Sequence, residues 1–182
     1  MQIKTEEKKY ALSVLGASCA ACRILYPSIL EKKKISDFYE ALSENLMDFF
    51  KSEAEVHKEK YEKLPRKRGR VMEQLRMNLF FTVTFNDEKI LSITREYVIC
   101  LGKKLLNYKK DCEVWNLKEE ILIHPKELFP RKARKTAENN EFFFDGDAVL
   151  VENLFPQTVG TDGRRIRLSD YVRETRFKKQ TK

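Results

Sequence analysis

The sequence has 182 residues, of which 42% are hydrophobic and 11% aromatic, which is enough for one domain with a buried core. Charged residues make up 35%, against a usual share of about 25%, and the formal net charge is +8. No window approaches the ~18–20 apolar residues of a membrane span, and the charged N-terminus lacks the apolar run of a signal peptide. We therefore expect a cytoplasmic protein without a membrane span. Its basic charge leaves open either an acidic partner or a basic surface with no such partner.

The first elements expected along the chain are a strand and a long helix. Residues 8–26 alternate in polarity as a strand does, with a bend allowed at Gly16. Pro27 is expected to end this strand, because proline has no N–H to donate to a strand ladder. After it, apolar residues recur at steps of three and four, which predicts an amphipathic helix over about 36–62. The apolar positions of this helix are Ile35, Phe38, Tyr39, Leu42, Leu46, Phe49 and Phe50.

The stretch from residue 75 to residue 99 has the pattern of an antiparallel hairpin. Apolar and polar residues alternate on both sides of Asn86-Asp87, whose short polar side chains favour a turn. The apolar face of such a hairpin needs a cover, and the apolar stripe of the long helix is the expected one. The helix residues predicted to pack on the hairpin are Phe38, Leu42, Leu46 and Phe49.

Further strands and a second helix are expected in the C-terminal half. Asp145-Gly146 is typical of the tight turn of a hairpin, and Pro125 is a favourable first residue for a helix. The predicted elements are a strand at 108–117, a short helix at about 125–138, a hairpin at 142–151 and a strand at 164–172.

The order of these elements predicts the fold class. Strands and helices do not alternate strictly, as they do in parallel α/β folds, so we expect an α+β fold with an antiparallel β-sheet. One long amphipathic helix, about 36–62, would pack on one face of the sheet, and a short second helix would span about 125–138. We expect a single domain over 1–172, followed by a polar basic tail over 173–182.

Several short phrases of the sequence resemble the extracellular domain of lysozyme-sensing anti-sigma factors, which also precedes some polysaccharide deacetylases and occurs in uncharacterised clostridial proteins. The phrases are Arg-Ile-Leu-Tyr-Pro (23–27), Ile-Ser-Asp-Phe-Tyr (35–39), Phe-Thr-Val-Thr-Phe-Asn (81–86), Ile-Leu-Ser-Ile-Thr-Arg-Glu-Tyr (90–97), Trp-Asn-Leu (115–117), His-Pro-Lys-Glu-Leu-Phe-Pro (124–130) and Phe-Phe-Phe-Asp-Gly-Asp-Ala-Val-Leu-Val (142–151). The resemblance implies the fold of that domain. The Gly-Gly-Ala-His-Gly loop usual in the family is replaced here by Val-Ile-Cys-Leu-Gly-Lys-Lys after Tyr97.

Cys19-Ala-Ala-Cys22 has the spacing of a metal knuckle or a redox pair. A zinc site needs two more ligands, and the remaining candidates are Cys100, Cys112, His57 and His124. In a regular strand Cys19 and Cys22 would point to opposite faces, and the segment is a poor helix start for a thiol of low pKa. We therefore predict buried or half-buried thiols without a metal, with zinc binding or redox chemistry as the alternative.

No catalytic triad, P-loop or metalloprotease motif is present. We expect His57 to be solvated at the charged end of the long helix, and His124 to be structural in a short connection. Basic clusters are the other feature that could bind a ligand, if they converged on phosphates. They are Arg66-Lys67-Arg68 with Arg70, Arg131–Lys135, and Arg164-Arg165 with Arg167. We expect them on separate faces, because the segments with 66–70 and 164–167 are far apart in the sequence and nothing in the pattern pairs them. Aromatic residues do not interleave with the clusters, as a stacking platform for nucleic acid would need.

The sequence thus predicts a non-enzymatic, sensor-like or binding domain whose ligand and binding residues are unknown. No catalytic residue, metal ligand or cofactor is assigned. The expected partner is a protein or a cell-wall-related ligand, in preference to nucleic acid. A basic cytosolic protein that associates with nucleic acid is the alternative, and a small hydrolase with an unrecognised site is a further one.

Overall fold

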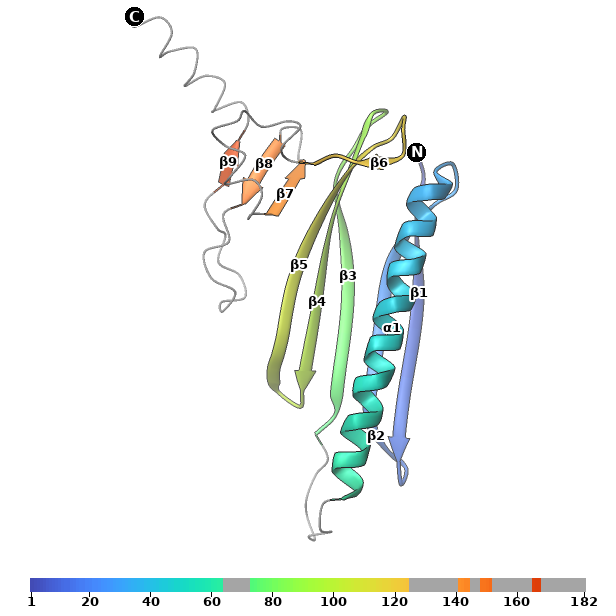
Figure 1. Ribbon diagram of the computed structural model, residues 1–182, viewed down its shortest axis with the longest axis vertical. Helices are drawn as coiled ribbons and strands as arrows, with labels where there is room; N and C mark the ends of the chain where they lie inside the picture. Colours follow the sequence, from blue (N-terminus) through green and yellow to red (C-terminus); the bar gives the residue numbers. More distant parts are fainter. Residues whose placement is uncertain (64–72, 125–140, 145–147, 152–164, 168–182) are drawn as a thin grey trace, which may run out of the picture. The chain divides into compact units, whose positions relative to one another are not determined.

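The computed structural model describes residues 1–63, 73–124, 141–144, 148–151 and 165–167, which form one helix and nine strands (Figure 1). The helix α1 spans Lys33–Glu62. The strands are β1 Ile3–Val14, β2 Ala17–Ile29, β3 Leu75–Asn86, β4 Ile90–Leu101, β5 Lys104–Asn116, β6 Ile121–Leu122, β7 Glu141–Phe144, β8 Ala148–Val151 and β9 Arg165–Arg167. The chain divides into two compact units. The first comprises Gln2–Phe81 and Glu96–Lys110, and the second comprises Thr82–Arg95 and the described residues from Asp111 onward.

The sheet topology contradicts the predicted fold class. Strands β1 to β6 form one sheet in chain order, and β7 to β9 form another. β1 and β2 pair antiparallel, but β2 and β3 pair parallel over Ala20–Ile24. The prediction of an antiparallel sheet with two helices is therefore wrong, because the sheet is mixed and the described residues are mostly strand, with α1 their one helix. Residues 125–138, the predicted second helix, and 173–182, the predicted tail, lie outside the described residues. The single domain over 1–172 stays a prediction.

The parallel pairing follows from the lengths of β2 and α1. The 13 residues of β2 span about 43 Å, and the 30 residues of α1 span about 45 Å. The helix therefore returns the chain along the whole strand, so that β3 starts at the same end as β2 and runs in the same direction. A single crossover helix is enough for this pairing, which does not require strict alternation of strands and helices along the entire chain.

The strand predicted over 8–26 is two strands joined by a tight turn. Leu15 and Gly16 form this turn with φ angles of 52° and 81°, a conformation that suits the twist of a hairpin and that glycine adopts without strain. Pro27 does not end β2, since it pairs with Thr5 of β1. The pairing of β2 with β3 ends at Ile24, so among the described residues Pro27 has a neighbouring strand only on the β1 side. Proline is tolerated at such an edge position.

Helix α1 packs on β2 and β1 within the first unit. Its buried residues are Ile35, Tyr39, Ser43, Met47, Phe50 and Ala54. Three of the seven predicted apolar positions, Ile35, Tyr39 and Phe50, are therefore buried. Phe49 is 50% exposed, whereas Phe50 is 1% exposed. Phe38, Leu42 and Leu46 are half-buried along the flank. The prediction that Phe49 is a core residue is wrong.

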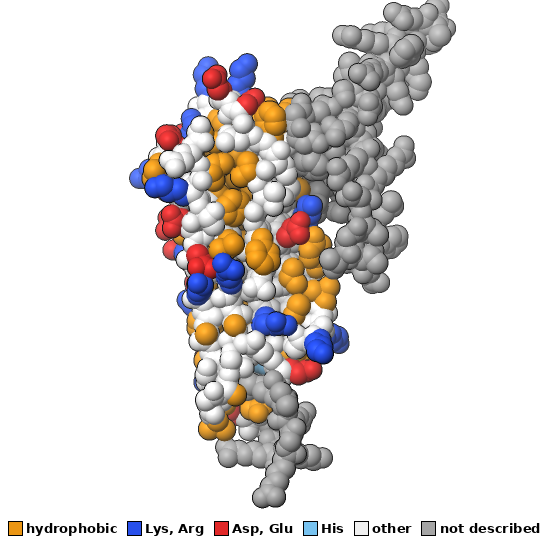
Figure 2. Space-filling model, turned by 180° about the vertical axis from the view of Figure 1, so that it is seen from behind, with side chains coloured by type: hydrophobic (Ala, Val, Ile, Leu, Met, Phe, Trp, Pro, Cys, Tyr) orange, Lys and Arg blue, Asp and Glu red, His pale blue; other side chains and the backbone are white. Residues whose placement is uncertain are grey.

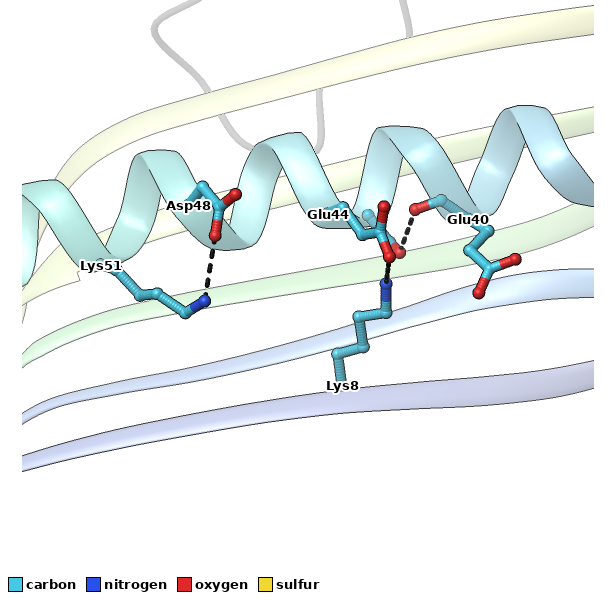
Figure 3. A network of polar contacts seen from close by, with 6 residues as sticks. Lys8, Glu40, Glu44, Asp48 and Lys51 are labelled. Atoms are coloured by element: carbon cyan, nitrogen blue, oxygen red, sulfur yellow. Dashed lines mark hydrogen bonds and ion pairs between the residues drawn. The ribbon is translucent and has the colours of Figure 1, made fainter.

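The core of the first unit consists of small and apolar side chains from α1, β1, β2 and β3. They are Val14, Cys19, Ala20, Cys22, Ile24, Met47, Phe50, Ala54, Leu75, Met77 and Leu79. The ring of Tyr10 meets that of Phe50 edge-on, with centroids 6.2 Å apart. On the surface, Lys8 of β1 reaches Glu44 of α1 at 3.3 Å, beside the helical pair of Lys51 and Asp48 (Figure 3). Such exposed pairs contribute only about 0–1 kcal/mol, so apolar contact is what fixes the helix to the sheet.

Two hairpins form at the predicted places in the chain. Asp87 closes the turn between β3 and β4, where its carboxylate accepts hydrogen bonds from the N–H groups of Ile90 and Lys89, and these bonds lower the pKa of Asp87. A link this short between neighbouring strands requires them to be antiparallel. The second hairpin pairs β7 with β8 antiparallel. The ring of Phe144 lies against Phe85, with centroids 4.9 Å apart.

Candidate functional site

A depression of about 360 Å³ lies on one face of β1, β2 and β3. We call it the basic depression, and its outward-facing residues are Lys9, Ala11, Ala21, Arg23, Arg76 and Asn78. They alternate along the strands with Tyr10, Cys22 and Met77, which pack in the core with Phe50 of α1. Because side chains alternate between the two faces of a sheet, the basic depression is on the face opposite α1.

The register of the three strands sets the outline of the basic depression. Ala11 pairs with Ala21, and Ala21 pairs with Arg76, so these three residues form one row across the strands. The neighbouring row consists of Lys9, Arg23 and Asn78. Strands are about 4.8 Å apart and same-face rows about 6.7 Å apart. An alanine rises only one carbon above the sheet, so the hollow is the space above the two alanines, bounded by longer cationic side chains.

The cations of the basic depression have different partners. Glu7 pairs with Lys9 Nζ at 2.7 Å and accepts a hydrogen bond from Arg23 Nε at 2.6 Å. Hydrogen bonds from these two residues lower the pKa of Glu7, which is therefore ionised at neutral pH. Arg76 Nη2 donates to the carbonyl oxygen of Gly102 at 2.6 Å. The basic depression is lined by three cations, Lys9, Arg23 and Arg76. Two carboxylates lie near them, Glu7 beside Lys9 and Arg23 and Glu73 beside Gly102, so one positive charge is in excess.

This arrangement is suited to holding an anion beside an apolar surface. A guanidinium has several N–H donors in one plane, which match the oxygens of a carboxylate or a phosphate. The contact to Gly102 restricts how the guanidinium of Arg76 can turn. On the face shown in Figure 2, hydrophobic side chains lie among both basic and acidic side chains. Phe80, two residues beyond Asn78 on β3, is 43% exposed.

A second charged cluster lies in the second unit, where it is buried. Arg95 of β4 and Glu113 of β5 are 7% and 8% exposed. Arg95 Nε lies 3.0 Å from both carboxylate oxygens of Glu113, and Arg95 Nη2 donates to Glu113 as well. Asp111 lies 3.6 Å from the same Nη2. Buried charges are tolerated when they are paired and hydrogen-bonded, so we assign this cluster to the structure of the β4–β5 pair.

The expectation that Cys19 and Cys22 point to opposite faces is wrong. The register of β1 and β2 shifts between Leu12 and Ser13, which leaves Cys19 as the extra residue of a β-bulge. Cys19 therefore enters the same core as Cys22, and the two are 0% and 4% exposed. Burial raises the pKa of Cys19, and it raises the pKa of Cys22 to about 12. Within the described ranges, no group of three or more His, Cys, Asp or Glu residues could hold a metal ion.

Alkylation should separate these two thiols from the other two. Cys100 and Cys112 are half-buried, so iodoacetamide at pH 8 is expected to modify them faster than Cys19 and Cys22. The pKa of Cys22 rises from 9.0 to about 12 on folding. The protonated Cys22 thiol therefore contributes fully to the stability of the folded state below pH 9, and this contribution is lost as the pH rises toward 12. Peptide mapping by mass spectrometry measures the rates, and urea is the control because it should equalise them. Native Cys22 reacting as fast as Cys100 would contradict the burial.

The two histidines differ in their surroundings. His57 is half-buried, and its Nε2–H donates to the carbonyl oxygen of Glu73 at 3.0 Å. The ring is therefore partly in solvent, and it also joins α1 to the residues just before β3. His124 is exposed, and the described residues end there before the next gap.

No helix in the described part of the chain is both long and apolar enough to cross a membrane.

The predicted basic clusters do not contain the residues of the basic depression. Clusters 66–70 and 131–135 lie outside the described residues, and Arg165–Arg167 form β9, whose side chains are outside them too. Lys9, Arg23 and Arg76 are distant in sequence and meet only through the register of β1, β2 and β3. The sequence signal that could have found them is the alternation of polar and apolar residues along each strand. This alternation places the three residues on one face of the sheet, but it does not show which of them lie in the same row.

Comparison with solved structures finds a likeness of fold. A DUF3298-family protein from Bacteroides fragilis aligns over 91% of this chain and 89% of that chain, with a TM-score of 0.59 and 10% sequence identity. The two folds are similar. A DUF3298-family protein from Pseudomonas aeruginosa aligns over 76% of this chain and 62% of that chain, with a TM-score of 0.49 and 8% identity. No family model and no curated protein matches the sequence.

At this level of identity the DUF3298 likeness concerns the fold alone. It fits the resemblance to the anti-sigma-factor domain as far as the fold is concerned. The specific relation to that domain, and the link to clostridial proteins, stay predictions.

Proposed function

We propose that this protein is a non-enzymatic binding domain that holds its ligand in the basic depression. The observation that carries the proposal is a hollow of about 360 Å³ floored by alanine and bounded by Lys9, Arg23 and Arg76. This volume falls within the range of about 300–1,000 Å³ that is usual for small-molecule sites. The DUF3298 likeness supports an uncharacterised domain of this fold. A cell-wall-related ligand or a protein, as the sequence resemblance implies, would be a source of the bound group.

The chemistry of the surrounding groups favours binding over turnover. Burial keeps the thiols of Cys19 and Cys22 protonated, which makes them poor nucleophiles. The charged groups at the basic depression are fixed cations and one ionised carboxylate, Glu7, which accepts hydrogen bonds from two of them. These are groups that hold a charged ligand in place.

A thermal-shift comparison tests this proposal. The parent protein and the double variant Arg23→Gln/Arg76→Gln are melted with small organic anions, organic cations, neutral sugars and soluble wall fragments. A ligand that binds only the folded state raises the melting temperature by mass action. We expect at least one anionic member of the panel to raise the melting temperature of the parent and to leave that of the variant unchanged.

The matched control removes two positive charges elsewhere. Lys51 and Lys60 are exposed on α1, so Lys51→Gln/Lys60→Gln lowers the net charge equally and should keep the parent's response. Mass spectrometry of the ligand after incubation checks that it is recovered unchanged. Equal responses of the parent and Arg23→Gln/Arg76→Gln to every compound, or chemical conversion of the ligand that Arg23→Gln/Arg76→Gln abolishes, would overturn the proposal.

A further inference from the structure

We infer that the ligand of the basic depression is a small organic carboxylate, with its charged end at Arg76 and its apolar stem over Ala11 and Ala21. The inference rests on the proposed function and specifies the ligand class of the same site. It follows from the three cations, from the register that places them around the alanines, and from the apolar side chains beside them.

The position of the carboxylate follows from the contacts of the cations. Lys9 and Arg23 share the single carboxylate of Glu7, which offsets one of their two positive charges within the protein. Arg76 instead donates to a carbonyl oxygen, which orients its guanidinium without cancelling its charge. A charge-assisted pair between a guanidinium and a carboxylate is stronger than a neutral hydrogen bond and favours planar, two-oxygen partners. Arg76 is therefore the residue that contacts the carboxylate most directly.

The apolar part of the ligand follows from the floor of the basic depression. Ala11 is exposed and Ala21 half-buried, and their methyl groups form the floor. An inorganic anion would leave these apolar surfaces in water. A short hydrocarbon stem would cover them, and each buried methylene raises affinity by about fourfold at most.

The opposite face of the first unit has acidic side chains along α1. Glu40, Glu44 and Asp48 follow one another along α1 at steps of four residues, and the close view shows them with Lys8 and Lys51 (Figure 3). Lys8 and Lys51 pair with Glu44 and Asp48, which offsets two charges of this row. The positive excess at the basic depression, rather than repulsion by α1, is what attracts an incoming anion.

An NMR titration tests the inference. Acetate, butyrate and hexanoate are added separately to the labelled protein at constant ionic strength, with hexanamide as the neutral analogue and inorganic phosphate as the point anion. We expect saturable shifts at the amides of Ala11, Ala21 and Arg76, with affinity increasing from acetate to butyrate to hexanoate. Hexanamide and phosphate should bind at least tenfold more weakly than hexanoate, since each lacks one half of the recognition.

Three variants show whether the named residues carry the binding. Arg76→Gln should weaken hexanoate binding at least tenfold, and Ala21→Leu should abolish it by filling the hollow. Lys51→Gln, which removes a charge from α1, should leave it unchanged. The amide spectrum of each variant shows whether it is folded, and Arg76 and Ala21 have outward-facing side chains that the core does not need.

The outcomes separate this inference from the proposed function. Hexanoate binding that Arg76→Gln or Ala21→Leu leaves intact would overturn the inference, and so would phosphate binding as tight as hexanoate. If hexanoate does not bind but another compound stabilises the parent and not Arg23→Gln/Arg76→Gln, the inference fails while the proposed function stands. If no compound distinguishes those two proteins, both fail.

Discussion

Replacing Phe50 with alanine is expected to lower the free energy of unfolding by about 3–5 kcal/mol. Phe50 is 1% exposed and lies in the core between α1 and the sheet, where its ring meets Tyr10 of β1. Its removal takes apolar surface out of the core and leaves a cavity that rigid strands cannot fill. Urea unfolding followed by circular dichroism measures the change, and the slope of the transition shows whether unfolding is still two-state.

The neighbouring residue provides the matched control. Phe49→Ala removes the same atoms from the same helix, but the side chain of Phe49 is 50% exposed. We expect this variant to lose about 1 kcal/mol or less, because half of the ring surface is already in water. Equal losses for the two variants, or a larger loss for Phe49→Ala, would mean that α1 presents a different face to the sheet.

The pair also shows why the phase of the helix was predicted incorrectly. Of the seven apolar positions predicted for the helix, the four expected to pack on the hairpin, Phe38, Leu42, Leu46 and Phe49, lie along the more hydrophobic edge. The buried stripe contains Ser43 and Ala54 in addition to large residues. Ser43 is tolerated there because its hydroxyl donates to the carbonyl oxygen of Glu40 at 2.6 Å. Small residues let the helix approach β2 closely, a preference that hydropathy does not record.

The strand segments were predicted better than their pairing. Alternation of polarity is local, so the strands near 75–86 and 90–101 and the hairpin near 141–151 could be found from the sequence. The direction of β3 relative to β2 depends on a helix that spans the full strand length, which is a tertiary property. The bulge at Cys19 is equally invisible, and it reverses the side on which that thiol lies.

The candidate site depends on pairing even more strongly than the fold does. The basic clusters found in the sequence are contiguous, whereas Arg23 and Arg76 are 53 positions apart by their numbers in the chain. They lie in neighbouring rows on one face of the sheet, because Ala21 pairs with Arg76 and Asn78 pairs with Arg23. The hollow between them also needs two alanines opposite each other, Ala11 and Ala21. A shift of one residue in this register would turn one set of these side chains to the other face.

Replacing Arg95 with methionine is expected to lower the free energy of unfolding by about 3–5 kcal/mol. The substitution leaves the carboxylate of Glu113, 8% exposed, without its cation and facing Asp111. Neither methionine nor the surrounding apolar residues can hydrogen-bond to it, and desolvation of an unpaired charge is costly. Lys110→Met is the matched control on the same strands, because Lys110 pairs with Glu96 at 3.4 Å where both side chains are exposed to solvent. That control should lose no more than about 1 kcal/mol.

A second substitution should restore much of the stability lost in Arg95→Met. In Arg95→Met/Glu113→Leu both buried charges are replaced by apolar groups, so no unpaired carboxylate stays in the interior. We expect the double variant to be more stable than Arg95→Met alone by at least about 1 kcal/mol, and this non-additivity measures the coupling of the two residues. Asp111 keeps its charge in both variants and its side chain is 28% exposed, but it faces a second carboxylate only in Arg95→Met, so the measured coupling includes the loss of that repulsion. Urea unfolding of the parent, the two single variants and the double variant completes the cycle. Additive losses, or an Arg95→Met variant as stable as Lys110→Met, would show that the charge of Arg95 does not stabilise the β4–β5 pair.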